Sequence, residues 1–241
     1  MIRTFWFFFK LFAGLLFLES QRGKMFRIRK EKGEEAYRQA VTDTAAKWCR
    51  KRLEEAGATV YVHGIEKIPD RNVLFVCNHL SNIDFAVIFS EINRYVSFVA
   101  KKETEKIPFL NKWMVMLNTL FMDRSDMKSQ LKNILQGIEM LKAGETVMIF
   151  PEGTRSRDGK MLDFKAGSFK LATKSGVPVV PLTLVGTNNI LEANNYRLKP
   201  GDVHFYVHDP IYMEDLDAEQ KKNLHVIVQD IVAKTYYEHV N

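Results

Sequence analysis

The segment Val73-Leu74-Phe75-Val76-Cys77-Asn78-His79-Leu80-Ser81-Asn82-Ile83-Asp84 sets the architecture that we expect for this chain. Its first five residues have the β-branched and aromatic content of a buried strand, whereas residues 83–92 repeat apolar side chains at helical spacing. The change of period predicts a strand followed by a helix, which the serine or asparagine at 81–82 can cap. The turn would bring His79 and Asp84 together.

Strand-like and helix-like runs alternate after residue 57. This alternation predicts an α/β domain with a mixed sheet flanked by helices. The expected strands lie near residues 58–63, 73–77, 95–99, 119–122, 146–150, 179–185 and 203–207. The expected helices lie near residues 82–93, 109–117, 126–142, 167–175 and 217–238, and we expect residues 187–202 to form a loop flanking the site.

His79 and Asp84 have the spacing of an oriented general base. An aspartate that accepts from one imidazole nitrogen fixes the tautomer and leaves the other nitrogen to take a proton from an alcohol. An unperturbed histidine pKa of about 6.5 suits this task at neutral pH. Because this spacing alone is common, a histidine that only caps or fills a turn is the alternative.

Three further segments follow this pair in order. They read Phe121-Met122-Asp123-Arg124, Phe150-Pro151-Glu152-Gly153-Thr154-Arg155 and Val177-Pro178-Val179-Val180-Pro181. Together with the His79–Asp84 block, they resemble the four motif blocks of the HxxxxD glycerolipid acyltransferases, and most of all those of the 1-acylglycerol-3-phosphate acyltransferases. The resemblance covers residues 64–186 and includes two supporting stretches, 100–103 and 164–167.

The resemblance implies an enzyme of phospholipid biosynthesis. The implied reaction moves an acyl chain from a thioester to the free sn-2 hydroxyl of lysophosphatidic acid and forms phosphatidic acid. By the same resemblance, His79 deprotonates that hydroxyl and Asp84 supports it. The donor is acyl-CoA or acyl carrier protein, between which the sequence does not choose, and we expect no metal or other cofactor. Glycerol-3-phosphate or another lysophospholipid is the alternative acceptor.

The phosphate of such an acceptor calls for fixed cations. The resemblance assigns this role to Arg124 and Arg155, because a guanidinium can bind phosphate oxygens bidentately. Lys101 is a weaker third candidate.

The motif that contains Glu152 offers further contacts to substrate. Glu152 can hold Arg155 or accept from the glycerol hydroxyl. Gly153 and Thr154 let backbone N–H groups approach an anion closely. The alternative is a simple polar turn after the strand expected at 146–150.

Two positions qualify the resemblance. The family has glycine six residues before the arginine of its second block, whereas Asn118 stands here. Asparagine tolerates positive φ better than most residues, so we expect the turn to survive. Cys77 shares a strand face with His79 and is a rival nucleophile, but we interpret it as a small buried thiol.

The amino-terminal residues 5–18 are nearly all apolar, with interruptions at Lys10 and Gly14. As a helix they span roughly 21 Å, less than the roughly 30 Å of a hydrocarbon core. We therefore predict a helix that lies in the membrane surface with Lys10 directed outward. A signal peptide and a helix buried in the core are the alternatives. The expected apolar face comprises Phe5, Phe8, Phe9, Phe12, Leu15 and Leu16.

A basic run and a second amphipathic helix follow. The run contains Arg22, Lys24, Arg27, Arg29, Lys30 and Lys32 and suits anionic headgroups on the cytoplasmic side of the cell membrane. The second helix, near residues 34–55, can pack on the first. We therefore divide the chain into a membrane-anchoring two-helix segment, residues 1–57, and a catalytic domain, residues 58–241, bound peripherally or monotopically.

The net charge of +6 and the pI near 9.2 leave nucleic-acid binding as a competing class. The cations cluster beside an apolar helix and no nucleic-acid motif is visible, so we expect membrane lipids rather than nucleic acid as partners. A noncatalytic lipid-binding module is the alternative to an enzyme.

Overall fold

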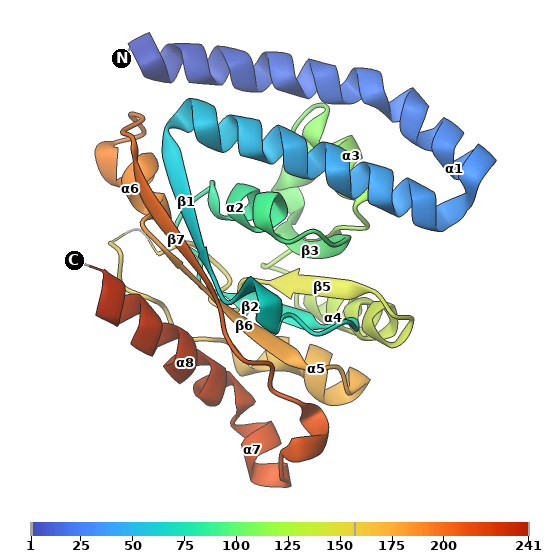
Figure 1. The fold of residues 1–241 in the computed structure, drawn as a ribbon. Helices are drawn as coiled ribbons and strands as arrows, with labels where there is room; N and C mark the ends of the chain where they lie inside the picture. Colours follow the sequence, from blue (N-terminus) through green and yellow to red (C-terminus); the bar gives the residue numbers. More distant parts are fainter. Residues whose placement is uncertain (1, 157, 241) are drawn as a thin grey trace.

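The computed structural model describes residues 2–156 and 158–240, and Figure 1 shows an α/β domain beneath a long amino-terminal helix. Each of the seven predicted strands is present, and the sheet has the order β1-β7-β6-β2-β5-β3-β4. The strand bounds are β1 Ala58–His63, β2 Leu74–Cys77, β3 Val96–Lys101, β4 Leu120–Met122, β5 Thr146–Ile149, β6 Val179–Val185 and β7 Gly201–Val207.

The sheet is mixed, as the sequence predicts. Strands β2 to β6 run parallel to one another, whereas β7 pairs with β6 in the antiparallel direction and β1 runs parallel to β7. The carboxyl ends of β2, β3, β4, β5 and β6 therefore meet at one edge of the sheet. In parallel sheets this edge is where ligands bind.

Helices cover both faces of the sheet, because β2 is apolar on both sides. Val73, Phe75 and Cys77 pack into the cluster that includes α1 and α2, whereas Leu74 and Val76 pack into the cluster under α4, α5 and α8. The helices are α2 Asp84–Glu91, α3 Leu110–Met116, α4 Met127–Lys142, α5 Lys170–Ser175, α6 Thr187–Ile190, α7 Ala218–Lys222 and α8 Leu224–His239. Short 3-10 turns lie at η1 Ile65–Lys67, η2 Lys102–Lys106, η3 Ala166–Phe169, η4 Glu192–Asn194 and η5 Met213–Asp215.

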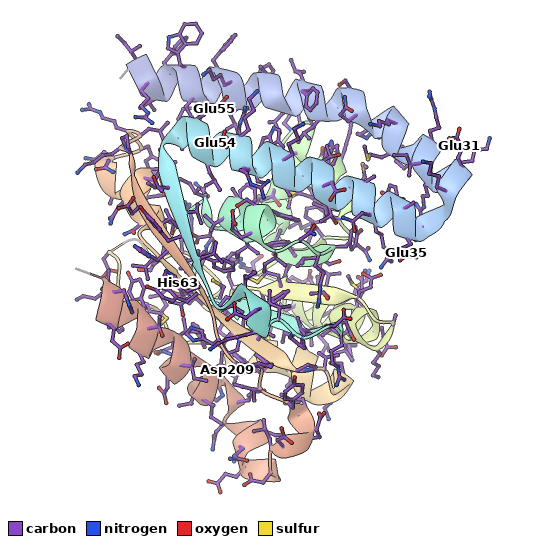
Figure 2. The ribbon with its side chains drawn as sticks, viewed as in Figure 1. Glu31, Glu35, Glu54, Glu55, His63 and Asp209 are labelled. Atoms are coloured by element: carbon purple, nitrogen blue, oxygen red, sulfur yellow. The ribbon has the colours of Figure 1, made fainter. Side chains whose placement is uncertain are left out.

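The amino-terminal helix α1, Ile2–Ala56, consists of two arms that fold back on each other (Figure 1). The break lies at Gly33, whose φ of 88° is a conformation that favours glycine. Glu31 and Glu35 flank this break at the outer end of the hairpin (Figure 2). The first helix is thus longer than expected, because the basic run continues it.

A glycine, an ion pair and an aromatic contact hold the first arm in place. An added Cβ at Gly14 would lie 2.5 Å from Arg52 Nη1, so glycine allows the two arms to approach. Lys112 of α3 pairs with Glu19 at 2.9 Å, and Phe12 packs edge to face on Phe109. The contact between Gly14 and Arg52 shows that Gly14 faces the second arm, not the solvent.

Among the described residues, no helix has the length and apolarity that a membrane crossing requires.

Two segments differ from the prediction. Residues 187–202 are not a structureless loop: they contain α6, η4 and the first residues of β7. The predicted helix at 217–238 is divided at Asn223, and Asp217 caps its first part with a capping box. The proposed boundary between residues 57 and 58 separates α1 from β1. The outer ends of the two proposed segments, Met1 and Asn241, lie outside the described residues.

Candidate active site

His79 and Asp84 meet at the turn between β2 and α2. The Nδ1 atom of His79 lies 2.7 Å from Oδ2 of Asp84. Asp84 is fully buried in the first turn of α2, whereas the His79 side chain keeps 19% of its surface exposed. This contact leaves Nε2 as the ring nitrogen that can take a proton from a substrate. The juxtaposition predicted from the sequence is present.

Backbone donors also orient the Asp84 carboxylate. Its Oδ2 accepts from the N–H groups of Leu80 and Ser81 at 2.7 and 2.9 Å. Its Oδ1 is buried and has no hydrogen-bond partner within the described part of the chain. The predicted cap is shifted, since Ile83 is the N-cap residue and Ser81 Oγ accepts from its N–H at 3.1 Å. Two backbone N–H groups of the turn thus donate to the same carboxylate oxygen that contacts His79.

The imidazole of His79 is packed on the segment that follows β5. Its ring stacks on Phe150 with centroids 4.1 Å apart and planes at 17°. The carbonyl of His79 accepts from the Ser156 N–H at 2.9 Å. The neighbouring Asn78 side chain bridges to both backbone groups of Leu184 on β6. These contacts connect the first and third motif blocks and restrict the imidazole.

Glu152 does not hold Arg155, one of the two roles we had considered. Its Oε1 accepts from the His79 N–H at 2.6 Å, and its Oε2 accepts from the Leu162 N–H at 2.8 Å. Burial raises the pKa of Glu152 to about 7, opposed by these two N–H groups and assisted by the charge of Asp84. Glu152 therefore shapes the backbone that carries His79.

Arg155 is held by a residue that sequence analysis missed. Its Nη1 donates to Oε1 of Glu192 at 2.9 Å. The same carboxylate accepts from Ser81 Oγ at 2.5 Å and from the Asn82 N–H at 2.8 Å. Glu192 lies in the stretch that we expected to be a loop, and no motif singles it out. Arg155 is thereby connected to the turn that carries His79.

Gly153 and Thr154 form the turn after β5. Gly153 has a φ of 73°, and its N–H donates to the carbonyl of Phe150 at 3.1 Å. An added Cβ at Gly153 would lie 2.6 Å from Nζ of Lys165, so the glycine permits close approach of an ammonium group. Thr154 is exposed. This polar turn thus borders the His79 network.

Lys101 and Arg124 lie at the same edge of the sheet but farther along it. Lys101 ends β3, and Arg124 follows β4, two and three strands away from β2. At about 4.8 Å per strand, these distances amount to roughly 10 and 14 Å. Both side chains are exposed, and Lys101 pairs with Glu103 at 3.0 Å. His79, Asp84, Glu152 and Arg155 thus form one network, with these two cations to its side.

The two qualifying positions behave as expected. Asn118 adopts a φ of 55° and donates from its side chain to Glu145 Oε2 at 2.8 Å, so the turn survives without glycine. Cys77 is fully buried, and burial raises the pKa of its thiol well above the usual value. A buried thiol of this kind is a poor nucleophile.

A sequence profile of the family described as Acyltransferase matches residues 59–185, more than half of the chain. The chain belongs to this acyltransferase family. The matched residues include His79, Asp84, Arg124, Glu152 and Arg155.

Named relatives agree with this membership. The chain is 36% identical over 167 residues to the Brassica napus protein "1-acyl-sn-glycerol-3-phosphate acyltransferase BAT2, chloroplastic"; the match covers 67% of this chain and 48% of that protein. The chain is 32% identical over 180 residues to the Borreliella burgdorferi protein "1-acyl-sn-glycerol-3-phosphate acyltransferase"; the match covers 74% of this chain and 72% of that protein. The chain thus spans about half the length of the plant relative.

A solved structure has the same fold as this chain. It is the crystal structure of the 1-acyl-sn-glycerophosphate (LPA) acyltransferase PlsC from Thermotoga maritima, with a TM-score of 0.85 and 32% identity. The match covers 98% of this chain and 94% of that chain. It therefore includes the two-armed helix as well as the sheet.

Proposed function

We propose that this protein transfers an acyl chain from an acyl thioester to the sn-2 hydroxyl of 1-acylglycerol-3-phosphate and forms phosphatidic acid. The names of its relatives support this acceptor. The single observation that carries the proposal is the contact of 2.7 Å between His79 Nδ1 and Asp84 Oδ2, on a turn to which Glu192 connects the guanidinium of Arg155.

His79 acts as the general base in this proposal. Its Nε2 takes the proton of the glycerol hydroxyl while that oxygen bonds to the thioester carbonyl carbon. Asp84, which is fully buried, stabilises the imidazolium that forms. The tetrahedral intermediate then collapses, the carbon–sulfur bond breaks, and the imidazolium returns its proton to the leaving thiolate. A thioester is reactive enough that binding and proton transfer suffice without a covalent nucleophile.

The acceptor phosphate binds at the cations on this edge of the sheet. Arg155 is the nearest candidate, because Glu192 ties it to the turn after His79. Arg124 and Lys101 extend the positive charge toward β3 and β4, where they can meet a larger headgroup or the phosphates of a donor.

In this proposal the first arm of α1 binds the membrane surface, where the lipid acceptor resides. Its outward stripe is strongly exposed, at 67% for Phe5, 55% for Phe9, 57% for Phe12 and 46% for Leu16. An exposed stripe of this size indicates a lipid or protein contact. Arg22 and Arg29 pair with glutamates, whereas Lys24, Arg27, Lys30 and Lys32 are exposed. These cations suit the anionic headgroups of the cytoplasmic leaflet.

An assay of free thiol release tests the proposed reaction. Purified protein receives lysophosphatidic acid with acyl-CoA or with acyl carrier protein, and glycerol-3-phosphate and other lysophospholipids serve as competing acceptors. We expect turnover of lysophosphatidic acid and a loss of at least a hundred-fold in His79→Ala. Equal rates in the variant and the parent would refute the role of His79 as the general base. A noncatalytic module would bind lipid vesicles but release no thiol with any acceptor.

A further inference from the structure

Glu192 joins two parts of the site that are far apart in the sequence. Its carboxylate accepts hydrogen bonds from Arg155 Nη1 at 2.9 Å, from the Asn82 N–H at 2.8 Å and from Ser81 Oγ at 2.5 Å. Its side chain keeps only 13% of its surface exposed. Three donors thus converge on one nearly buried carboxylate beside the turn that carries His79.

The segment that carries Glu192 is held firmly. It follows β6, the parallel neighbour of β2, so it leaves the sheet at the edge where His79 lies. Gly186 has a φ of 87° at the start of this segment, where an added Cβ would collide with the carbonyl oxygen of Asp202. Ile190 is fully buried in the core, and its carbonyl accepts from the Lys199 N–H at 3.0 Å. Glu192 therefore stands on a fixed support.

We propose that Glu192 is a positioning residue that orients Arg155 toward the phosphate of the acceptor. This inference rests on the proposed transfer to a phosphate-bearing acceptor. Arg155 carries five N–H donors in a planar fork, and Glu192 engages one nitrogen of that fork. Because the guanidinium is rigid and planar, this contact also restricts the directions in which its other N–H groups can donate. A phosphate then meets a guanidinium whose rotation is already restricted, so less entropy is lost on binding.

Glu192 also explains how the phosphate site and the base keep their relative position. The turn at residues 80–82 donates to Asp84 through Leu80 and Ser81, and to Glu192 through Ser81 and Asn82. The same turn therefore carries the orientation of the base and of Arg155. Removal of the carboxylate should release the cation while the direct contact between His79 and Asp84 persists.

Kinetics of Glu192→Ala test this inference, with Glu54→Ala as a matched control. Glu54 is exposed near the end of the second arm of α1 (Figure 2) and takes no part in the contacts of His79, Asp84 or Arg155 described above. We expect Glu192→Ala to raise the KM for lysophosphatidic acid about 10- to 100-fold, because small misplacements of a binding group have effects of this size. The KM for the acyl donor should change less than about two-fold. Glu192→Gln, which keeps one acceptor oxygen, should recover most of the loss.

A double-mutant cycle with Arg155→Ala identifies the route of the effect. If Glu192 acts through Arg155, the double variant should be no worse than Arg155→Ala alone, because coupled residues are not additive. Losses that multiply would overturn the proposal. It would also be overturned by equal increases of both KM values together with a lower melting temperature, or by a Glu192→Ala variant that matches the parent.

Thermal stabilisation by sn-glycerol 3-phosphate separates this inference from the proposed function. The probe binds through its phosphate without turnover, so an inactive parent can still be tested. We expect the probe to raise the melting temperature of the parent and of Glu54→Ala, and to have a smaller effect on Glu192→Ala. If the parent is active and the probe stabilises Glu192→Ala as much as the parent, only the positioning role is refuted. A parent that is neither active nor stabilised refutes both proposals.

Discussion

Asp84 Oδ2 lies 2.7 Å from Nδ1 of His79 and receives two backbone N–H groups of the intervening turn as well. One oxygen of a fully buried carboxylate therefore orients both the imidazole and the backbone that carries it. Such an arrangement fixes the tautomer of the imidazole, because the ring nitrogen that faces the carboxylate must carry the proton.

Asp84→Asn should leave the fold intact and remove most of the activity. The amide side chain occupies the same space and can keep its oxygen where Leu80 and Ser81 donate, but it lacks the negative charge that stabilises the imidazolium of His79. We expect kcat to fall by about 10³- to 10⁴-fold, as in other histidine–aspartate pairs, with little change in the KM for the acceptor. Steady-state thiol release measures both constants. Asp43→Asn, at an exposed position of α1, is the control and should retain full activity.

Glu152 should make the stability of the protein fall as the pH rises toward neutrality. Its pKa is raised from 4.5 to about 7, so the folded state retains a proton that the unfolded chain has lost. This contribution is fully present below about pH 4.5, decreases above it and is lost as the pH passes 7. Its size is on the order of 3 kcal/mol.

The comparison with Glu152→Gln isolates that contribution. The glutamine variant lacks the ionisable group, so its urea midpoint should depend less on pH between 4.5 and 7.5 than that of the parent. Parallel curves for the two proteins would show that Glu152 ionises with its ordinary pKa.

The outward stripe of α1 should control binding to vesicles. Phe5→Ser combined with Phe9→Ser removes two exposed aromatic rings without touching the buried side of the helix. Burial of a phenylalanine side chain is worth about 1.5–3 kcal/mol, so we expect at least a ten-fold weaker partition in a flotation assay. Val226→Ser, an exposed apolar position on α8, should bind like the parent. Unchanged flotation of the double variant would place the lipid contact elsewhere.

Gly137→Ala should destabilise the α/β fold. The added methyl group would lie 2.6 Å from Cδ2 of Leu171 and 3.3 Å from Cδ1 of Leu120, where α4 packs on α5 and β4. Overpacking of this kind costs about 1–3 kcal/mol. Urea unfolding would measure the loss. Gly23→Ala is the control, because an added Cβ there contacts no atom within 4 Å among the described residues. An equal or higher midpoint in Gly137→Ala would mean that the two helices can move apart.

The positions of the strands and the contact between His79 and Asp84 were predictable because they depend on neighbouring residues. The apolar run before His79 marks a strand that is buried on both faces, and the helical spacing after residue 83 marks α2. Asp84 lies only five positions after His79, so the turn alone brings them together. Asn118 was likewise predictable from its tolerance of positive φ.

The partners of Glu152 and Arg155 were not predictable in this way. Arg155 pairs with a residue 37 positions later, and Glu152 binds a backbone group 73 positions earlier. Neither separation has a periodic or motif signal. A usable hint was that residues after parallel neighbouring strands meet at one edge, but the order of the strands had to be known first.

Local sequence was thus sufficient for the seven strands, the motif blocks and the contact between His79 and Asp84, since periodicity and turn geometry act over a few residues. Only the tertiary structure showed that Glu192 pairs with Arg155 and that Glu152 accepts from the backbone N–H of His79. It also showed that Arg124 lies three strands away from the strand that precedes His79. These relationships depend on which strands lie side by side, and that order is stabilised by contacts between distant segments in the two hydrophobic clusters that cover the faces of the sheet.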